Sequence, residues 1–329
     1  MKNTTIKEKL YKLLEIREVG AVLPLLIAFI LFTSKSEQFL TGQNMTNVLR
    51  IASFTMICAI GETYLLIAGS WDISVGAVYT LGGVAAGLMM TTYGLPIWLS
   101  VVLALVAGGL VGVVNGFLVQ KLNMAPFVAT IGTQYMCKGL VQVVTKGTPV
   151  YPLPDAFLVV GQQDLNLFGL MIPYIVVITV ILSVIAGLVL KYTVYGRMLY
   201  AAGGNGEAAR LAGIPTSRLR FEAFILTGVL SSLTGVLQAS RLGSGQTSIG
   251  NGFEGTVIAG AVIGGISMAG GAGSIFGMAL GAFFMAMITN GMTLIKVSAY
   301  WQTFVTGALL IFACSLEYLR NQLKASLAK

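Results

Sequence analysis

The sequence predicts an all-α, polytopic membrane helical bundle of about ten transmembrane helices. Of its 329 residues, 56% are hydrophobic and only 10% are charged, whereas soluble domains carry roughly 25% charged residues. The mean hydropathy is +0.86, and the 41 glycines are typical of closely packed membrane helices. These values indicate an integral membrane protein and exclude a soluble enzyme with a single anchor.

Long apolar windows set the expected number of helices. A helix that crosses a hydrocarbon core of ~30 Å needs about 20 apolar residues. Ten suitable windows occur, near 18–34, 47–68, 74–93, 95–119, 126–145, 169–191, 221–240, 252–269, 273–294 and 299–317. The eighth has a continuous apolar part of only about 13 residues, or ~20 Å of helix, which predicts a broken or half-crossing helix. Windows 2–5 and 7–10 are two blocks that enter the membrane in opposite senses, and this order predicts an inverted repeat.

Charge placement predicts the orientation. With a cytoplasmic amino terminus, fourteen lysines and arginines fall on cytoplasmic segments and five on external ones, while Lys138 falls within a span. This satisfies the positive-inside rule and places both termini in the cytoplasm. The net charge of +8 therefore orients the chain and does not indicate a nucleic-acid partner. Five cations precede the first apolar run, which is predicted to be an uncleaved span.

The chain is expected to form one transmembrane domain over 1–329. Its two long hydrophilic connections lie outside the membrane, at about 146–168, and inside, at about 192–219. Neither is long enough to form a separate soluble domain.

The chain lacks several residue types and motifs that common catalytic sites require. The chain has no histidine, which excludes HExxH zinc sites and Ser-His dyads. Its three cysteines stand alone in apolar runs, as buried small hydrophobic residues do. No Gly-Lys dipeptide occurs, so the chain lacks a GxxxxGK[ST] phosphate-binding loop. We expect no catalytic residue, metal or cofactor, and any ATP must be hydrolysed by a different chain.

A short polar helix in the inside connection is the strongest local signal. Asn205 is a suitable N-cap, Glu207 lies in the first turn and Arg210 lies in the last turn, as the helix dipole favours. Gly213 suits the left-handed position after the helix, and Pro215 prevents its continuation. A helix of one to two turns is not stable alone, so it must rest either on a partner chain or on its own bundle.

A series of motifs resembles the ribose-type ABC sugar permeases. The matching segments follow the family's order across roughly 45–315 and are Asp72-Ile73-Ser74-Val75-Gly76, Thr130-Ile131-Gly132-Thr133, Gly196–Ile214, Ala239–Gly245 leading to Gly250-x-Gly252-x-Glu254, Ile263-Gly264-Gly265 through Gly270–Ser274, Asn290-Gly291 and Tyr300-Trp301-Gln302. Glu62 departs from the pattern, because members more often carry an apolar residue there. Lys138, where many members have arginine, is a milder departure.

The resemblance implies a permease subunit of a binding-protein-dependent importer in the bacterial cytoplasmic membrane. Its solute would be a monosaccharide or a similar small polyhydroxylated molecule, and the family also includes autoinducer-2 permeases. The implied partners are a separate ABC ATPase subunit, an extracytoplasmic solute-binding protein and a second permease copy in a homodimer or pseudo-dimer, besides membrane lipid. The expected ATPase-coupling residues are Gly203, Asn205, Glu207, Ala208, Ala209, Arg210 and Gly213.

Polar residues in or beside the spans are candidates for the translocation pathway. They are Glu62, Asn115, Thr133, Gln134, Asn251 and Asn290. Uncharged hydrogen-bonding groups suit a neutral polyhydroxylated solute, and hydrogen bonds between helices are the alternative. Glu62 lies deep in a span, where an ionised carboxylate costs several kcal/mol unless it is paired or hydrated. It therefore either lines a water-filled route or is buried beside a polar partner. Asp72 and Ser74 are interpreted as a helix cap or as a gate that contacts solute.

Two charges flank the outer connection rich in glycine and serine. Arg241 and Glu254 are either solvated loop charges or contacts for a binding protein, where rim charges steer docking. The alternative function is an ion-coupled secondary transporter of a small polar solute, for which Glu62 with Lys138 offers thin support. The energy source distinguishes the two functions. An ABC importer needs ATP and a separate ATPase, whereas a secondary transporter needs an ion gradient alone.

Overall fold

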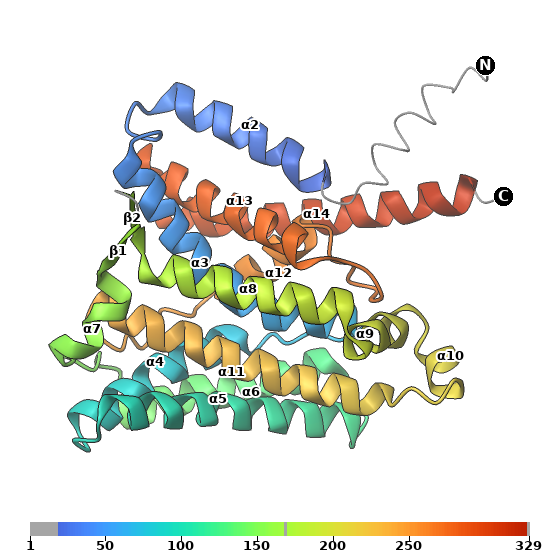
Figure 1. Ribbon diagram of the computed structural model, residues 1–329, viewed down its shortest axis with the longest axis horizontal. Helices are drawn as coiled ribbons and strands as arrows, with labels where there is room; N and C mark the ends of the chain where they lie inside the picture. Colours follow the sequence, from blue (N-terminus) through green and yellow to red (C-terminus); the bar gives the residue numbers. More distant parts are fainter. Residues whose placement is uncertain (1–18, 168–169, 328–329) are drawn as a thin grey trace.

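The computed structural model describes residues 19–167 and 170–327, and it is almost entirely helical (Figure 1). Within the described residues, five helices are long and apolar enough to cross a membrane, namely α3 (Gly42–Ile67), α5 (Ile97–Gln120), α8 (Tyr174–Tyr192), α11 (Thr216–Leu242) and α13 (Ile275–Leu294). Five further helices accompany them, namely α2 (Val19–Lys35), α4 (Val75–Thr91), α6 (Pro126–Thr145), α12 (Phe253–Ile263) and α14 (Ala299–Leu327).

Each of the ten predicted apolar windows overlaps one of these ten helices. The eighth window is helical only in α12, which has 11 residues. Such a helix is roughly 16 Å long and is too short to cross the hydrocarbon core alone, as predicted. The five cations expected before the first span, and Lys329 at the other terminus, lie outside the described residues.

The connection between α6 and α8 contains structure that the sequence analysis did not predict. α7 (Asp155–Gln162) is followed by an antiparallel hairpin of β1 (Asp164–Leu167) and β2 (Leu170–Pro173). The alternating Asp-Leu-Asn-Leu sequence of β1 suits a strand, and α8 begins only at Tyr174. The sixth apolar window therefore starts as a strand, and this hairpin is a local addition to a mostly helical fold.

The centre of the bundle is α11, which packs against α3, α4 and α5. Glycines allow these backbones to approach closely. A Cβ atom at Gly228 would collide with the carbonyl oxygen of Gly108 on α5, and one at Gly235 would collide with the carbonyl oxygen of Tyr79 on α4. Close backbone approach of this kind stabilises membrane bundles, because lipid gives little hydrophobic driving force for helix association.

The bundle has two distinct ends and an apolar outer surface. α7 and the hairpin lie at one end, and α9 (Val194–Gly204) and α10 (Gly206–Leu211) lie at the other (Figure 1). We refer to these as the hairpin end and the α10 end. α3 buries most of its side chains, whereas α5 and α8 expose apolar ones such as Val106, Leu110 and Ile181. Extensive exposed apolar surface on long helices is what a lipid environment requires.

Candidate functional site

Local hydrogen bonds define α10. The Asn205 Oδ1 atom accepts the backbone N–H of Ala208 at 3.0 Å, which confirms the predicted N-cap. The helix ends at Leu211, and Gly213 has φ +81°, which confirms the predicted left-handed position after it. Both ends of this six-residue helix are therefore fixed by the sequence itself.

α10 rests on the bundle with one side and presents the other to solvent. Ala209 is buried, whereas Glu207, Ala208 and Arg210 are exposed. Leu211 is 81% exposed. This exposed leucine and the charges beside it are accessible from outside the bundle. The exposed side of α10, rather than Ala209, is thus available to a partner.

Backbone contacts tie α9 to the end of α3. A Cβ atom at Gly203 would collide with the carbonyl oxygen of Ile67, the last residue of α3. The same carbonyl accepts the N–H of Gly271 at 2.9 Å. Arg220 on α11, which sequence reasoning missed, donates from Nε to the carbonyl of Ala68 at 2.8 Å. These contacts are close and involve backbone atoms, so α9 lies directly against the end of α3.

Aromatic side chains of α9 add to this attachment. The ring of Tyr195 lies 6.4 Å, between centroids, from the ring of Tyr64 on α3. Burial raises the pKa of the Tyr195 phenol to about 12, so the hydroxyl stays neutral at physiological pH. Tyr200 donates its hydroxyl proton to the carbonyl of Gly273 at 2.9 Å.

Buried polar side chains gather where α3 leads into α4. We call this group the buried polar cluster, and it comprises Glu62, Asp72, Ser74, Asn115, Thr130 and Thr133. Asp72, only 1% exposed, accepts the Ser74 backbone N–H at 2.7 Å and the Ser74 hydroxyl at 2.6 Å on Oδ1. Its Oδ2 atom accepts the Asn115 side-chain N–H at 3.0 Å.

The structure corrects the interpretation of Asp72 as a helix cap. The N-cap residue of α4 is Ser74, and its side chain makes no capping hydrogen bond. Asp72 instead closes a tight turn with Ser74 and bridges to α5 through Asn115. A side chain two residues before the N-cap residue thus holds the turn, as aspartate does in an Asx turn.

The cluster continues into α6. The Asn115 Oδ1 atom accepts the Thr133 hydroxyl at 2.7 Å, and the Thr130 hydroxyl oxygen accepts the N–H of Ile73 at 3.2 Å. Asn115 thereby joins α5 to both the α3–α4 turn and α6. Neither Thr130 nor Ile73 was singled out from the sequence as a pathway residue, because their proximity depends on how α4, α5 and α6 pack.

Two carboxylates, Glu62 in the cluster and Glu254 next to it, each have an oxygen atom that can accept a further hydrogen bond. Glu62 is fully buried, and its Oε1 atom accepts the N–H of Asp72 at 3.1 Å. Glu254 on α12 is partly buried, so it is not a solvated loop charge, and its Oε1 atom accepts the Gln134 side-chain N–H at 3.0 Å. Among the described residues, the Oε2 atoms of Glu62 and Glu254 have no hydrogen-bond partner.

No ion pair within residues 19–167 and 170–327 involves Glu62, Asp72 or Glu254. These groups are held instead by amide and hydroxyl donors. Buried acceptors that lack a donor carry a desolvation cost, which a neutral molecule with hydroxyl groups can relieve. The arrangement therefore suits polyhydroxylated solutes better than anions.

The remaining predicted pathway residues lie in other surroundings. Asn290 on α13 exchanges two amide hydrogen bonds with Asn44 on α3, of 3.0 and 2.9 Å. This reciprocal pair joins two helices and uses both ends of each amide. Asn251 is exposed in the turn before α12. Of the residues predicted to line the pathway, Glu62, Asn115 and Thr133 therefore lie together in the buried polar cluster. Gln134 donates a hydrogen bond to Glu254 next to it.

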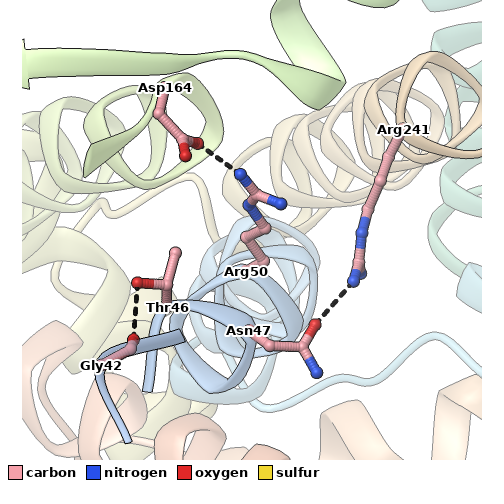
Figure 2. Close-up of polar contacts among 6 residues, drawn as sticks. All are labelled: Gly42, Thr46, Asn47, Arg50, Asp164 and Arg241. Carbon is pink, nitrogen blue, oxygen red and sulfur yellow. Dashed lines mark hydrogen bonds and ion pairs between the residues drawn. The ribbon is translucent and has the colours of Figure 1, made fainter. Parts of the chain in front are cut away.

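Arg241 lies at the hairpin end and is partly buried. It donates from Nη2 to the Asn47 side-chain oxygen at 2.8 Å, and its guanidinium carbon lies 5.6 Å from the Phe54 ring centroid. Nearby on α3, Arg50 pairs with Asp164 of β1 (Figure 2). The solvated-charge interpretation of Arg241 is therefore wrong. The sequence does not indicate the pair of Arg50 and Asp164, because Asp164 reaches Arg50 only through the unpredicted hairpin.

Comparison with known proteins gives consistent matches over nearly the whole chain. Residues 44–314 match the family described as branched-chain amino acid transport system / permease component. The ribose import permease protein of Bacillus subtilis (strain 168) is 34% identical over 306 residues, covering 92% of each chain. The D-allose transport system permease protein of Escherichia coli (strain K12) is 33% identical over 305 residues, covering 91% of each chain. The autoinducer 2 import system permease protein of Photorhabdus luminescens is 33% identical over 310 residues, covering 92% of each. No solved structure matches the chain.

Proposed function

The chain belongs to the branched-chain amino acid transport system / permease component family, and we propose on this basis that it is the membrane permease of a binding-protein-dependent ABC importer. Its solute is a monosaccharide or a similar small polyhydroxylated molecule. The observation that carries the proposal is 33–34% identity, over 91–92% of both chains, to permeases named for ribose, allose and autoinducer 2. These relatives do not favour the ion-coupled alternative.

The proposed topology is a single domain over 1–329 in the bacterial cytoplasmic membrane. Ten helices cross or enter the bilayer, both termini are cytoplasmic, and α3–α6 and α11–α14 form an inverted repeat. The overlap of all ten apolar windows with helices supports the number. The excess of lysine and arginine on the α10 side supports the orientation.

The α10 end is proposed to receive the separate ATPase subunit. The proposed contact and coupling residues are Gly203, Asn205, Glu207, Ala208, Ala209, Arg210 and Gly213, now joined by Leu211. Within this set the roles differ. The exposed side chains of α10 would contact the ATPase, whereas buried Ala209 and close-packed Gly203 would transmit its motion to the bundle. The contact between Gly203 and Ile67 leads to the end of α3, from which the chain continues to Asp72.

The buried polar cluster is proposed to line or gate the solute route. Asp72 and Ser74 form the turn between α3 and α4, and the route would pass the acceptor atoms of Glu62 and Asn115. A neutral polyhydroxylated solute needs weak, replaceable hydrogen-bond partners, and the cluster supplies these without a cation. Gln134, Asn251 and Asn290 complete the proposed set.

An importer of this kind also implies a solute-binding protein, a second permease copy and membrane lipid as partners. A solute-binding protein would dock at the hairpin end, where Arg241 is a proposed contact. Glu254, the other proposed contact, accepts a hydrogen bond from Gln134 beside the buried polar cluster, so it would be reached only through the bundle. A second permease copy would complete the membrane unit. Membrane lipid surrounds the exposed apolar faces of α5 and α8.

Reconstitution tests this function directly. Proteoliposomes that hold the permease, its cognate ATPase and its solute-binding protein should accumulate a radiolabelled monosaccharide from a test panel only when ATP reaches the ATPase. Omission of the ATPase should reduce uptake to background, because this chain contains no phosphate-binding loop. Accumulation driven by a sodium or proton gradient, with no ATPase present, would contradict the proposal.

A further inference from the structure

A groove of about 480 Å³ opens at the α10 end, between the last residues of α5 and the turn that leads from α10 into α11. Its apolar lining comes from Ile214, Pro215 and Phe221. Phe221 packs against Gly116 of α5, so the groove's floor is formed by the tightly packed α5–α11 pair. Its volume is that of a small-molecule site rather than of a single ion.

The groove carries positive charge. Lys121, Arg210 and Arg218 line it, and no acidic side chain is among its lining residues. Arg218 donates from Nε to Glu222 at 2.7 Å, while Lys121 and Arg210 form no ion pair among the residues that the structure describes. Two of three cations thus lack a carboxylate partner, and the groove is complementary to an anionic group.

The position of the groove indicates that a bound molecule would also have an apolar part. Lys121 directly follows the last residue of α5, the end of a long apolar helix. One and two turns earlier on that helix, Phe117 and Val114 are 49% and 43% exposed. Charge and exposed apolar surface therefore meet at the depth where a lipid's headgroup joins its acyl chains.

We propose that this groove binds the headgroup of an anionic phospholipid, whose acyl chains lie along Phe117 and Val114 of α5. Lys121 and Arg218 hold the phosphate oxygens, Arg210 adds positive charge to the groove while it remains a proposed ATPase contact, and the Ser217 hydroxyl at the groove's wall adds a hydrogen-bond donor. Free phosphate would satisfy the cations but would leave the apolar lining unused. The proposal depends on the groove's charge and its place in the membrane, and not on the transported solute.

Native mass spectrometry of the purified permease in detergent micelles tests this proposal. The permease is titrated in parallel with dioleoyl phosphatidylglycerol and with zwitterionic dioleoyl phosphatidylcholine. We expect tighter binding of phosphatidylglycerol, and Lys121→Gln should weaken that binding about five-fold, the contribution of one cation near anionic lipid. Lys191→Gln, which removes a cation at the end of α8 outside the groove, should leave the binding unchanged.

A second pair of variants separates lipid binding from folding. Ser217→Glu places a carboxylate in the first turn of α11, where the helix dipole favours it, so the fold should persist while phosphatidylglycerol binding falls at least five-fold. Ser217→Gln, of the same size but uncharged, should retain most binding. The proposal is overturned if the two lipids bind equally, if Lys121→Gln and Ser217→Glu leave binding unchanged, or if millimolar inorganic phosphate displaces the phosphatidylglycerol.

Discussion

Leu211→Glu is expected to abolish ATP-driven uptake while the permease remains folded and inserted. Leu211 is 81% exposed, so its replacement should change the free energy of unfolding by no more than about 0.5 kcal/mol. A carboxylate buried at the centre of an ATPase contact should instead cost about 2 kcal/mol or more of binding free energy, a loss of roughly 30-fold in affinity. ATPase binding by co-purification, and uptake in proteoliposomes, measure the two effects.

Leu40→Glu is the matched control for this prediction. Leu40 is also an exposed leucine, but it precedes α3 at the opposite end of the bundle, and its replacement should leave ATPase binding intact. Ala209→Glu would be a weaker probe of the same contact. Because Ala209 is buried against the bundle, its replacement would disturb folding and docking together. Normal ATPase binding and uptake by Leu211→Glu would remove α10 from the coupling mechanism.

Asp72→Ala is expected to lower both the thermal stability of the permease and its transport. The Asp72 carboxylate accepts hydrogen bonds from the Ser74 backbone, the Ser74 hydroxyl and the Asn115 amide. Its loss would leave these buried donors unsatisfied, at a cost of about 1–3 kcal/mol for each group that finds no other partner. Thermal unfolding in detergent, followed by size-exclusion chromatography, should show a clearly lower midpoint, and uptake should fall to background.

Two further variants separate stability from the solute route. Asp155→Ala removes an exposed carboxylate at the start of α7 and should leave the unfolding midpoint unchanged. Glu62→Gln keeps the Oε1 acceptor for the Asp72 N–H but replaces the unpartnered Oε2 atom with a donor. It should therefore unfold at nearly the parent temperature while uptake falls about ten-fold, as expected for the loss of one hydrogen bond of roughly 1.4 kcal/mol. Parent-like stability and uptake for Asp72→Ala would refute the structural role of the cluster, and parent-like uptake by Glu62→Gln would remove Glu62 from the route.

Helix positions and local caps were largely readable from the sequence. Apolar windows locate membrane helices because lipid requires continuous apolar segments, and each window overlaps a helix. The caps of α10 depend on residues three to four positions apart, so Asn205 and Gly213 identified its ends without tertiary information.

Contacts between distant segments were not readable in this way. For Asp72 the sequence favours a helix cap or a gate, because it does not show that Asn115 lies beside it, 43 residues further along the chain. For Arg241 the sequence leaves open a solvated charge or a binding-protein contact, because it does not show the partner Asn47, which lies 194 residues earlier. The hairpin was missed because its four-residue strands are shorter than the windows that locate spans. In each case the outcome depended on packing that a single sequence does not encode locally.

Photo-crosslinking from position 211 tests the central claim most directly. A photoreactive amino acid placed at Leu211, in the permease co-expressed with its ATPase and solute-binding protein, should form a covalent adduct with the ATPase subunit upon illumination. The same probe at Leu40 should form none. Adducts only with the permease itself, in a sample where the ATPase has co-purified, would show that α10 serves its own bundle and would contradict coupling through this helix.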